Sequence, residues 1–295
     1  MCKKIVASIM VWLMTVTMLL TPAYAISIPY KDSFLLETGE RYLKNNSEQF
    51  YTRSFSVEES KGGMLKVDVD GHGVYYIEKM NTKSMPSEFI IEGESFSTRE
   101  EKTIISGKEK VVSFIKNTSF VEEADKEELI SKIENTTFHL AEFGDNDKWA
   151  VAIYKEGKVY VNKRDYSITE WLVVHELIHA LKDYLDGECW LETGRFIEGM
   201  TDVITAEIIG DPFKKLKSGY VFFHQFAYSY IGVFGFEGVK SFLYGTLDEE
   251  LEIPRKEYEL FVYCINNAND EEYGTLCQYL AYNCLENWRM NRTSK

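Results

Sequence analysis

The stretch EWLVVHELIHALKDYLDGE, from Glu170 to Glu188, contains two of the five histidines of the 295-residue chain within a run of apolar residues. His175 and His179 are four residues apart, so on a helix their rings lie one above the other and can reach one point. Glu176 completes the pattern H-E-x-x-H, in which two histidines bind zinc and the glutamate acts as general base. The alternative is a buried structural pair of histidines that is bonded to carbonyl groups.

The boundaries of this helix are also indicated by the sequence. Ser167 and Glu170 form the S-x-x-E pattern of a capping box immediately before the apolar run. Gly187 is a natural end for a helix, because glycine adopts the left-handed conformation of a C-terminal cap without strain. Apolar residues cover most of the circumference between these limits, so we expect this helix to be buried.

A catalytic zinc ion needs a third protein ligand in addition to the two histidines. The longer pattern H-E-x-x-H-x-x-G-x-x-H is excluded, because Lys182 stands where the glycine would be and Leu185 where the histidine would be. The carboxylates downstream of the motif are the candidates that we consider next. The glutamates that follow the motif are Glu188, Glu192, Glu198 and Glu207.

Glu198 is the preferred third ligand. It lies in a predicted amphipathic helix, Arg195–Gly210, and Asp202 follows one turn later on the same face. A second carboxylate at this position can accept the free ring N–H of a histidine ligand, which fixes the tautomer of that ring. The alternative is that Glu198 and Asp202 form a solvated acidic pair.

HELIH at His175–His179, followed by 18 residues and then EGMTD at Glu198–Asp202, resembles the gluzincins, the thermolysin-like class of zinc metallopeptidases. The resemblance covers about Lys148–Gly210. It implies one Zn²⁺ per chain, with His175, His179 and Glu198 as ligands. It also implies Glu176 as the general base and Asp202 as the partner of a histidine ligand.

The chain also departs from this family. Ile197 precedes the expected ligand glutamate, where thermolysin has a polar residue, and no family signature follows Gly210. Gluzincins usually supply a tyrosine or histidine from the C-terminal half to stabilise the oxyanion. His224 and Tyr230 are the predicted catalytic residues of this kind, and Tyr220 and Tyr228 are further candidates.

The N-terminus has the features of an export signal over residues 1–25. Lys3 and Lys4 precede the apolar run Ile5–Leu20, and AYA at Ala23–Ala25 is a small-x-small cleavage site. The run is short for a membrane span, although an uncleaved anchor remains the alternative. We therefore expect a secreted or extracytoplasmic protein without stable membrane insertion after cleavage.

Charge and cysteine content agree with that compartment. The formal net charge of −14 disfavours nucleic acid as a partner. Four cysteines remain after removal of the signal, and their pairing is left open. They are Cys189, Cys264, Cys277 and Cys284.

The hydrophobic pattern predicts an α+β fold, and the resemblance to the gluzincins implies that this fold is of zincin-like type. Residues 26–108 form a β-rich region, with a hairpin in Met64–Met80, and could be a pro-segment, a substrate-binding module or a lobe of the catalytic domain. Residues 109–295 form the metallopeptidase domain, with a mixed sheet, the active-site helix and a mostly helical C-terminal half. Its predicted strands are Thr137–Phe143, Lys148–Tyr154 and Lys158–Asn162.

The function expected from these features is that of a secreted zinc metallopeptidase, more in keeping with an endopeptidase than an exopeptidase. Its peptide or protein substrate would pair with a strand edge near Ala150–Asn162. One alternative is an exported binding or inhibitory protein whose metal-bound site is inactive. Another is a helical surface protein with a structural histidine pair and no metal.

Overall fold

The structure is a computed structural model of the whole chain, and its contacts divide the chain into two units, residues 1–30 and residues 31–295. The first unit, which contains the predicted signal, lies outside the described residues, as do Cys189 and Tyr220. The structure describes residues 35–41, 55–60, 64–69, 73–78, 89–91, 95–144, 150–164, 167–185, 194–210, 221–246, 251–268 and 274–293.

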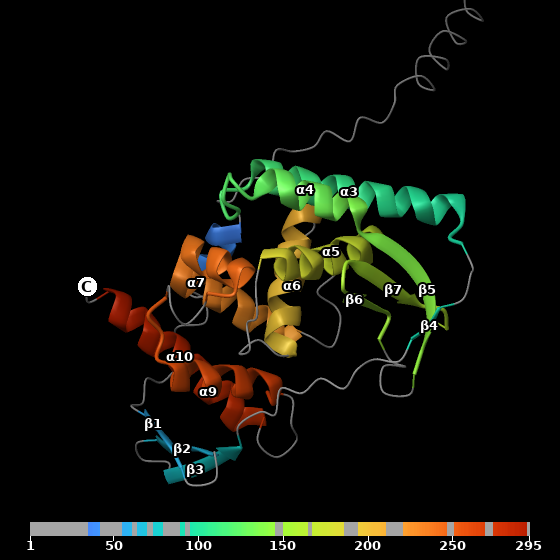
Figure 1. The fold of residues 1–295 in the computed structure, drawn as a ribbon. Helices are drawn as coiled ribbons and strands as arrows, with labels where there is room; N and C mark the ends of the chain where they lie inside the picture. Colours follow the sequence, from blue (N-terminus) through green and yellow to red (C-terminus); the bar gives the residue numbers. More distant parts are fainter. Residues whose placement is uncertain are drawn as a thin grey trace, which may run out of the picture. The chain divides into compact units, whose positions relative to one another are not determined.

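The second unit contains two small sheets and a larger helical part (Figure 1). A short helical segment, residues 35–41, precedes the labelled elements. The strands are β1 (Phe55–Glu59), β2 (Met64–Val69), β3 (Gly73–Glu78), β4 (Phe89–Ile91), β5 (Thr137–Phe143), β6 (Ala152–Lys155) and β7 (Lys158–Asn162). The helices are α3 (Thr98–Asn117), α4 (Lys126–Asn135), α5 (Glu170–Leu185), α6 (Arg195–Ile209), α7 (Val221–Tyr244), α9 (Arg255–Asn266) and α10 (Gly274–Thr293).

The two sheets differ in topology. The first is an antiparallel meander in the order β1-β2-β3. The second has the order β4-β5-β7-β6, in which β5 and β7 are parallel while β4 and β6 run antiparallel to their neighbours. Because the order ends at β6, one edge of this strand carries no partner strand among the described residues.

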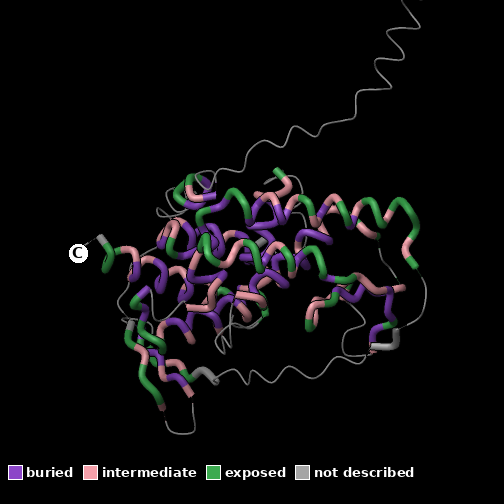
Figure 2. Tube along the Cα trace, turned by 45° about the horizontal axis from the view of Figure 1, so that its top comes forward, coloured by how far each residue is buried: buried purple, intermediate pink, exposed green. Residues whose placement is uncertain are grey.

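Helix α5 is the central element of the helical part, because α3, α4, α6, α7 and β6 all contact it. This position follows from its sequence, since apolar residues lie on most of its circumference and Val173, Val174 and Leu177 are fully buried. Figure 2 shows the buried positions concentrated in the interior of the helical part, while the long helices at its upper edge alternate between buried and exposed residues.

Close packing of α3 on α5 depends on Gly107. A Cβ atom added there would lie 2.4 Å from Cγ1 of Val173, so only glycine allows this approach without movement of a neighbour. Helix α7 is broken at Gly235, where φ is 59° and the backbone leaves the helical conformation.

The predicted α+β class is confirmed. The strands predicted at Thr137–Phe143 and Lys158–Asn162 form with those bounds, and the hairpin predicted in Met64–Met80 forms as β2 and β3. The strand predicted at Lys148–Tyr154 is displaced towards the turn and runs from Ala152 to Lys155.

The predicted division near Lys108 falls inside a continuous helix. Ser97 and Glu100 form a capping box with hydrogen bonds in both directions, and α3 runs from there through residue 108 to Asn117. The S-x-x-E signal was present in the sequence but lay within a stretch that otherwise alternates like strands. The segment before residue 108 therefore contributes a helix that packs on the motif helix.

The start of the motif helix is also corrected. Thr169, and not Ser167, caps α5, because its Oγ1 accepts a hydrogen bond from the N–H of Leu172 at 3.1 Å. Glu170 instead accepts a hydrogen bond from Ser106 of α3 at 2.7 Å and pairs with Lys110. Its carboxylate is thus used for packing between helices.

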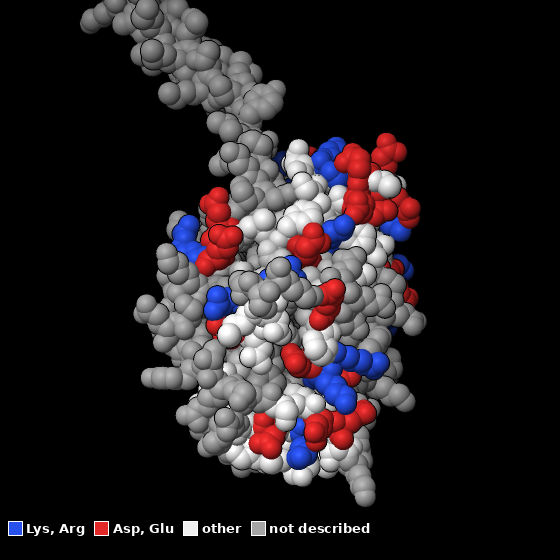
Figure 3. Space-filling view, turned by 90° about the vertical axis from the view of Figure 1, so that its left-hand side faces the viewer, with Lys and Arg blue, Asp and Glu red and all other residues white. Residues whose placement is uncertain are grey.

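Two further expectations concern membranes and cysteines. Among the described residues, no helix combines the length and apolar character that a membrane crossing requires. Cys264, Cys277 and Cys284 are buried and form no disulfide with one another, and the pairing of the four cysteines stays open. Acidic and basic side chains intermingle over the described surface that Figure 3 shows.

Candidate metal centre

The two histidines of the motif converge on one point above α5. Their Nε2 atoms lie 3.1 Å apart, and the ring planes meet at 74°. The i and i+4 positions of the helix bring the rings together, as the sequence predicts. The neighbouring α6 supplies the remaining side of the site, because it packs directly against α5.

Glu198, in the first turn of α6, faces both rings. Its Oε2 atom lies 3.1 Å from Nε2 of His175, and its Oε1 atom lies 3.5 Å from Nε2 of His179. These three side chains form the group within the described residues that could hold a metal ion. The structure thus brings together the three predicted ligands from two different helices.

Asp202 lies one turn further along α6 and contacts the other side of the His175 ring. Its Oδ1 atom is 2.8 Å from Nδ1 of His175. A carboxylate only accepts hydrogen bonds, so Nδ1 carries the hydrogen. In the neutral ring, Nε2 then presents a lone pair towards His179 and Glu198, which is the tautomer that a metal ligand requires.

The spacing of the donor atoms fits a tetrahedral zinc ion. At zinc–ligand distances of about 2.0–2.1 Å, two neighbouring tetrahedral ligands are separated by about 3.3 Å. The two Nε2 atoms are 3.1 Å apart, and they lie 3.1 and 3.5 Å from different oxygens of Glu198. With one ligand atom taken from each residue, the three atoms lie within 4.8 Å of one another. In addition, the lone pair of His175 faces a carboxylate oxygen, an arrangement that requires either a proton or a cation between them.

The pKa shifts of the site also indicate that its carboxylates stabilise a positive charge. Burial opposes protonation of His175, but hydrogen bonds to Asp202 and Glu198 outweigh it and raise the pKa of this ring well above its ordinary value. Burial alone would raise the pKa of Glu198, whereas its hydrogen bonds to the two rings lower it. These carboxylates would stabilise a metal cation for the same reason that they stabilise a proton.

Glu176 lies on the same helix and is 5% exposed. Burial raises its pKa, while the two neighbouring rings and an interaction with the backbone of Tyr154 act in the opposite direction. Helix α5 contacts the edge strand β6, which contains Tyr154. This contact could not be predicted from the sequence, because a backbone group leaves no signature in the identity of a residue.

The site opens to solvent on the Glu198 side. The side chain of Glu198 is 40% exposed and that of His179 is 19% exposed, whereas Asp202 behind His175 is 9% exposed. A metal ion held by the three ligands would therefore retain a face that water and a substrate can reach, which distinguishes catalytic from structural zinc sites.

The predicted catalytic residues of α7 are placed in the interior. His224 is 2% exposed and its Nε2 atom lies 2.7 Å from Oδ2 of Asp202. Tyr230 has no exposed surface and packs against Phe196 and Phe234. Side chains enclosed in this way do not reach a substrate in this conformation. His224 and Tyr230 therefore contact other protein groups, and not the substrate oxyanion as expected. Tyr228, a further candidate, is likewise buried.

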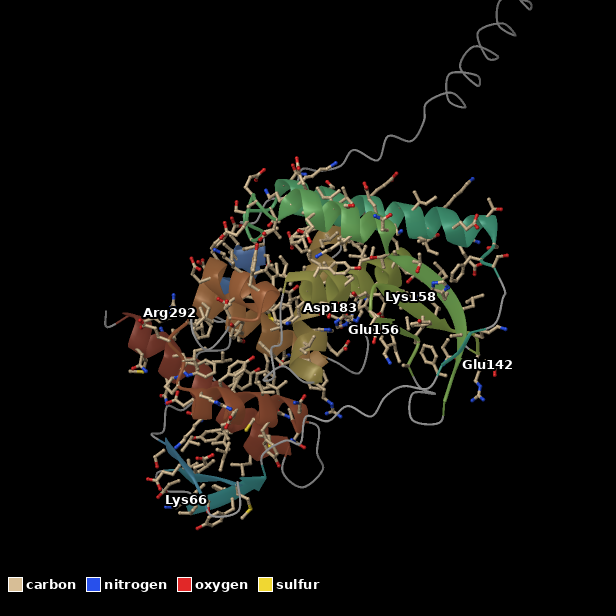
Figure 4. All side chains as sticks on the ribbon, in the orientation of Figure 1. Lys66, Glu142, Glu156, Lys158, Asp183 and Arg292 are labelled. Atoms are coloured by element: carbon tan, nitrogen blue, oxygen red, sulfur yellow. The ribbon has the colours of Figure 1, made fainter. Side chains whose placement is uncertain are left out.

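Near the C-terminal end of α5, the β6–β7 turn is attached to the same helix. The hydroxyl of Tyr154 donates to Asp183 at 2.9 Å and accepts from the N–H of Gly157 at 3.0 Å. Figure 4 labels Glu156 and Asp183 in this region, where the turn meets the helix. The edge strand is therefore fixed to the motif helix at the C-terminal end as well as beside Glu176.

Comparison of the chain with protein-family models, with curated proteins and with solved structures finds no match. The chemistry of the site is therefore argued from its own residues.

Proposed function

We propose that this chain is a zinc-dependent metallopeptidase with a zincin-like catalytic domain, in which His175, His179 and Glu198 hold one zinc ion. The observation that carries the proposal is the convergence of these three side chains, with Asp202 fixing the tautomer of His175. When bound, the metal would supply Lewis-acid activation of water and of a substrate carbonyl.

Glu176 would act as the general base and then as the proton donor. It lies next to a ligand histidine, is nearly buried, and has a pKa raised by that burial. A carboxylate whose pKa moves towards neutrality accepts a proton from water and returns it to a leaving amine more readily than a fully solvated one. Its contact with the backbone of Tyr154 holds it in place.

The edge of β6 that has no partner strand among the described residues supports an extended peptide as the substrate. This strand is the last in the order of its sheet, and it contacts the motif helix. An extended substrate can add to such an edge through backbone hydrogen bonds, which would bring a peptide bond alongside the metal ligands. Backbone pairing is available along an edge for the residues on both sides of a scissile bond, which favours endopeptidase activity.

The test begins with the zinc content of the purified mature chain, measured by elemental mass spectrometry, for the parent, Glu198→Ala and Glu207→Ala. Glu207 is the matched control, because it is a glutamate of the same helix outside the metal-binding group. We expect about one zinc ion per chain in the parent and in the control, and a large loss in Glu198→Ala. No zinc in the parent after zinc is supplied would refute the proposal.

Peptide cleavage is tested separately with a peptide library and the variant Glu176→Gln. We expect cleavage by the zinc-loaded parent and a loss of at least 100-fold in the variant, with zinc content unchanged, since general-base catalysis contributes about 10²–10⁴-fold. Zinc binding without any cleavage by the parent would instead indicate a metal-bound binding or inhibitory protein. That protein would share the site but lack the peptidase reaction.

A further inference from the structure

We propose that His224 is a positioning residue for the metal centre and acts through Asp202. This inference rests on the proposed zinc site and extends it to a third helix. Asp202 of α6 lies between two histidines, with Oδ1 2.8 Å from Nδ1 of His175 and Oδ2 2.7 Å from Nε2 of His224. Each oxygen of this carboxylate therefore has its own histidine donor.

Burial makes the two hydrogen bonds of Asp202 difficult to replace. The side chains of Asp202 and His224 are 9% and 3% exposed, so water cannot readily replace either hydrogen bond. A buried carboxylate oxygen that loses its partner incurs the full cost of desolvation, and the carboxylate would rotate or shift to regain a donor. Any such movement would weaken the second bond, to Nδ1 of His175, which keeps the lone pair of Nε2 directed at the metal position.

The hydrogen bond to Asp202 identifies the donor atom of His224. A carboxylate oxygen accepts, so Nε2 of His224 donates to it. Nδ1 of His224 is buried and has no hydrogen-bond partner among the residues that the structure describes. Asp202 is therefore the side chain to which the structure directs the His224 ring.

The backbone holds His224 at this distance. Helices α6 and α7 cross at Gly199, where an added Cβ atom would lie 2.8 Å from the carbonyl oxygen of Phe223. Phe223 precedes His224, and Gly199 follows Glu198, so this tight contact adjoins both the proposed ligand and the positioning residue. Helix α7 therefore contributes to the metal site without contacting the metal position.

Two substitutions separate positioning from packing. His224→Gln retains an N–H donor at about the reach of Nε2, whereas His224→Phe keeps an aromatic ring and removes the donor. The measured quantity is the zinc dissociation constant of the full chain, obtained by competition with a chelator. The apo stability of each variant is measured by denaturant unfolding, with Leu285→Ala as a control that removes buried side chain from α10.

We expect His224→Phe to weaken zinc binding by roughly 10-fold or more, the lower end of the effect of removing a partner of a ligand histidine. His224→Gln and Leu285→Ala should bind within about threefold of the parent, because the first restores the donor and the second leaves the network intact. Parent-like binding by His224→Phe would overturn the inference, as would an equal loss in His224→Gln. Absence of zinc from the parent would instead overturn the proposed function.

Discussion

Substitution of Gly199 by alanine tests whether the crossing of α6 and α7 sets the geometry of the metal centre. The added Cβ atom would lie 2.8 Å from the carbonyl oxygen of Phe223 and 3.0 Å from its carbonyl carbon, both of which are backbone atoms. No change of rotamer can relieve these contacts. To reach an ordinary contact of 3.4 Å, the carbonyl oxygen must withdraw by about 0.6 Å.

The magnitude follows from two opposing effects. Overpacking of a dense interior costs about 1–3 kcal/mol when the backbone must shift. Alanine in place of glycine within a helix returns about 1 kcal/mol. The difference is about 0–2 kcal/mol, and we expect Gly199→Ala to lower the free energy of unfolding by about 1–2 kcal/mol, because backbone atoms of Phe223 must move to relieve the contact.

The same displacement should also weaken zinc binding. The displaced segment includes His224, whose hydrogen bond to Asp202 is 2.7 Å long, and a shift of about 0.6 Å would lengthen it beyond the favourable range. We expect zinc affinity to fall by about 10-fold, as for loss of a partner of a ligand histidine.

The assays are denaturant unfolding of the apo chain and chelator competition for zinc. Leu285→Ala is the control, since it should cost about 2–5 kcal/mol of stability in the core of α10 and leave zinc affinity unchanged. Parent-like stability and affinity in Gly199→Ala would refute the claim that the crossing is tightly constrained. An equal loss of affinity in Leu285→Ala would show that general destabilisation explains the effect.

Three further predictions concern the surroundings of the site. Gly107→Ala should destabilise the chain by about 1–2 kcal/mol, because its Cβ would lie 2.4 Å from Val173, and the added substitution Val173→Ala should recover part of this loss in a double-mutant cycle of unfolding free energies. Burial raises the pKa of Glu207 to about 7 from an ordinary 4.5, so its contribution to stability is full below the ordinary value and is lost as pH rises through about 7. Glu207→Gln should abolish this loss of unfolding free energy, which we expect to be on the order of 1–3 kcal/mol between about pH 5 and pH 8 in denaturant titrations. If the difference in unfolding free energy between variant and parent is the same at both pH values, the prediction is contradicted. Tyr154→Phe removes the hydrogen bonds of its hydroxyl to Asp183 and Gly157 and should lower the unfolding free energy by about 1–2 kcal/mol, whereas an unchanged value would mean that this turn is not held by the hydroxyl.

Elements with a strong local period could be predicted from the sequence. The motif helix, the helix that carries Glu198, and the strands Thr137–Phe143 and Lys158–Asn162 all form close to their expected bounds. In each, the spacing of apolar residues agrees with a buried face, so local preference and tertiary packing favour the same structure. The structure also places Asp202 beside His175, because Asp202 shares a helix face with Glu198, four residues before it.

Helix starts were predicted less accurately where tertiary contacts compete with a local capping pattern. Ser97 and Glu100 make a capping box, whereas the similar pair Ser167 and Glu170 does not. The difference lies in tertiary contacts, because Ser106 and Lys110 of α3 engage the carboxylate of Glu170. A local pattern cannot reveal that a distant helix will compete for one of its members.

The long-range contacts of the site lay beyond sequence reasoning for a related reason. His224 is 22 residues from Asp202, and the sequence that separates them does not indicate the angle at which α6 and α7 cross. The sequence identified His224 as a residue able to perform chemistry, but a histidine can equally contact a substrate or support a ligand from behind. Burial distinguishes these roles, and burial depends on how the helices pack.

The assignment of Glu198 over Glu207 shows how far helix geometry alone can decide between candidate ligands. Successive residues of an α-helix are rotated by about 100°, so two residues nine apart point to nearly opposite sides, whereas Glu198 and Asp202 differ by only about 40°. Once Asp202 bonds to His175 at 2.8 Å, Glu198 must face the motif helix and Glu207 must face away from it. The raised pKa of Glu207 agrees with this, because burial raises it and no histidine lowers it. The carboxylate that accepts the ring hydrogen of His175 thus also determines which glutamate of α6 can serve as the third ligand.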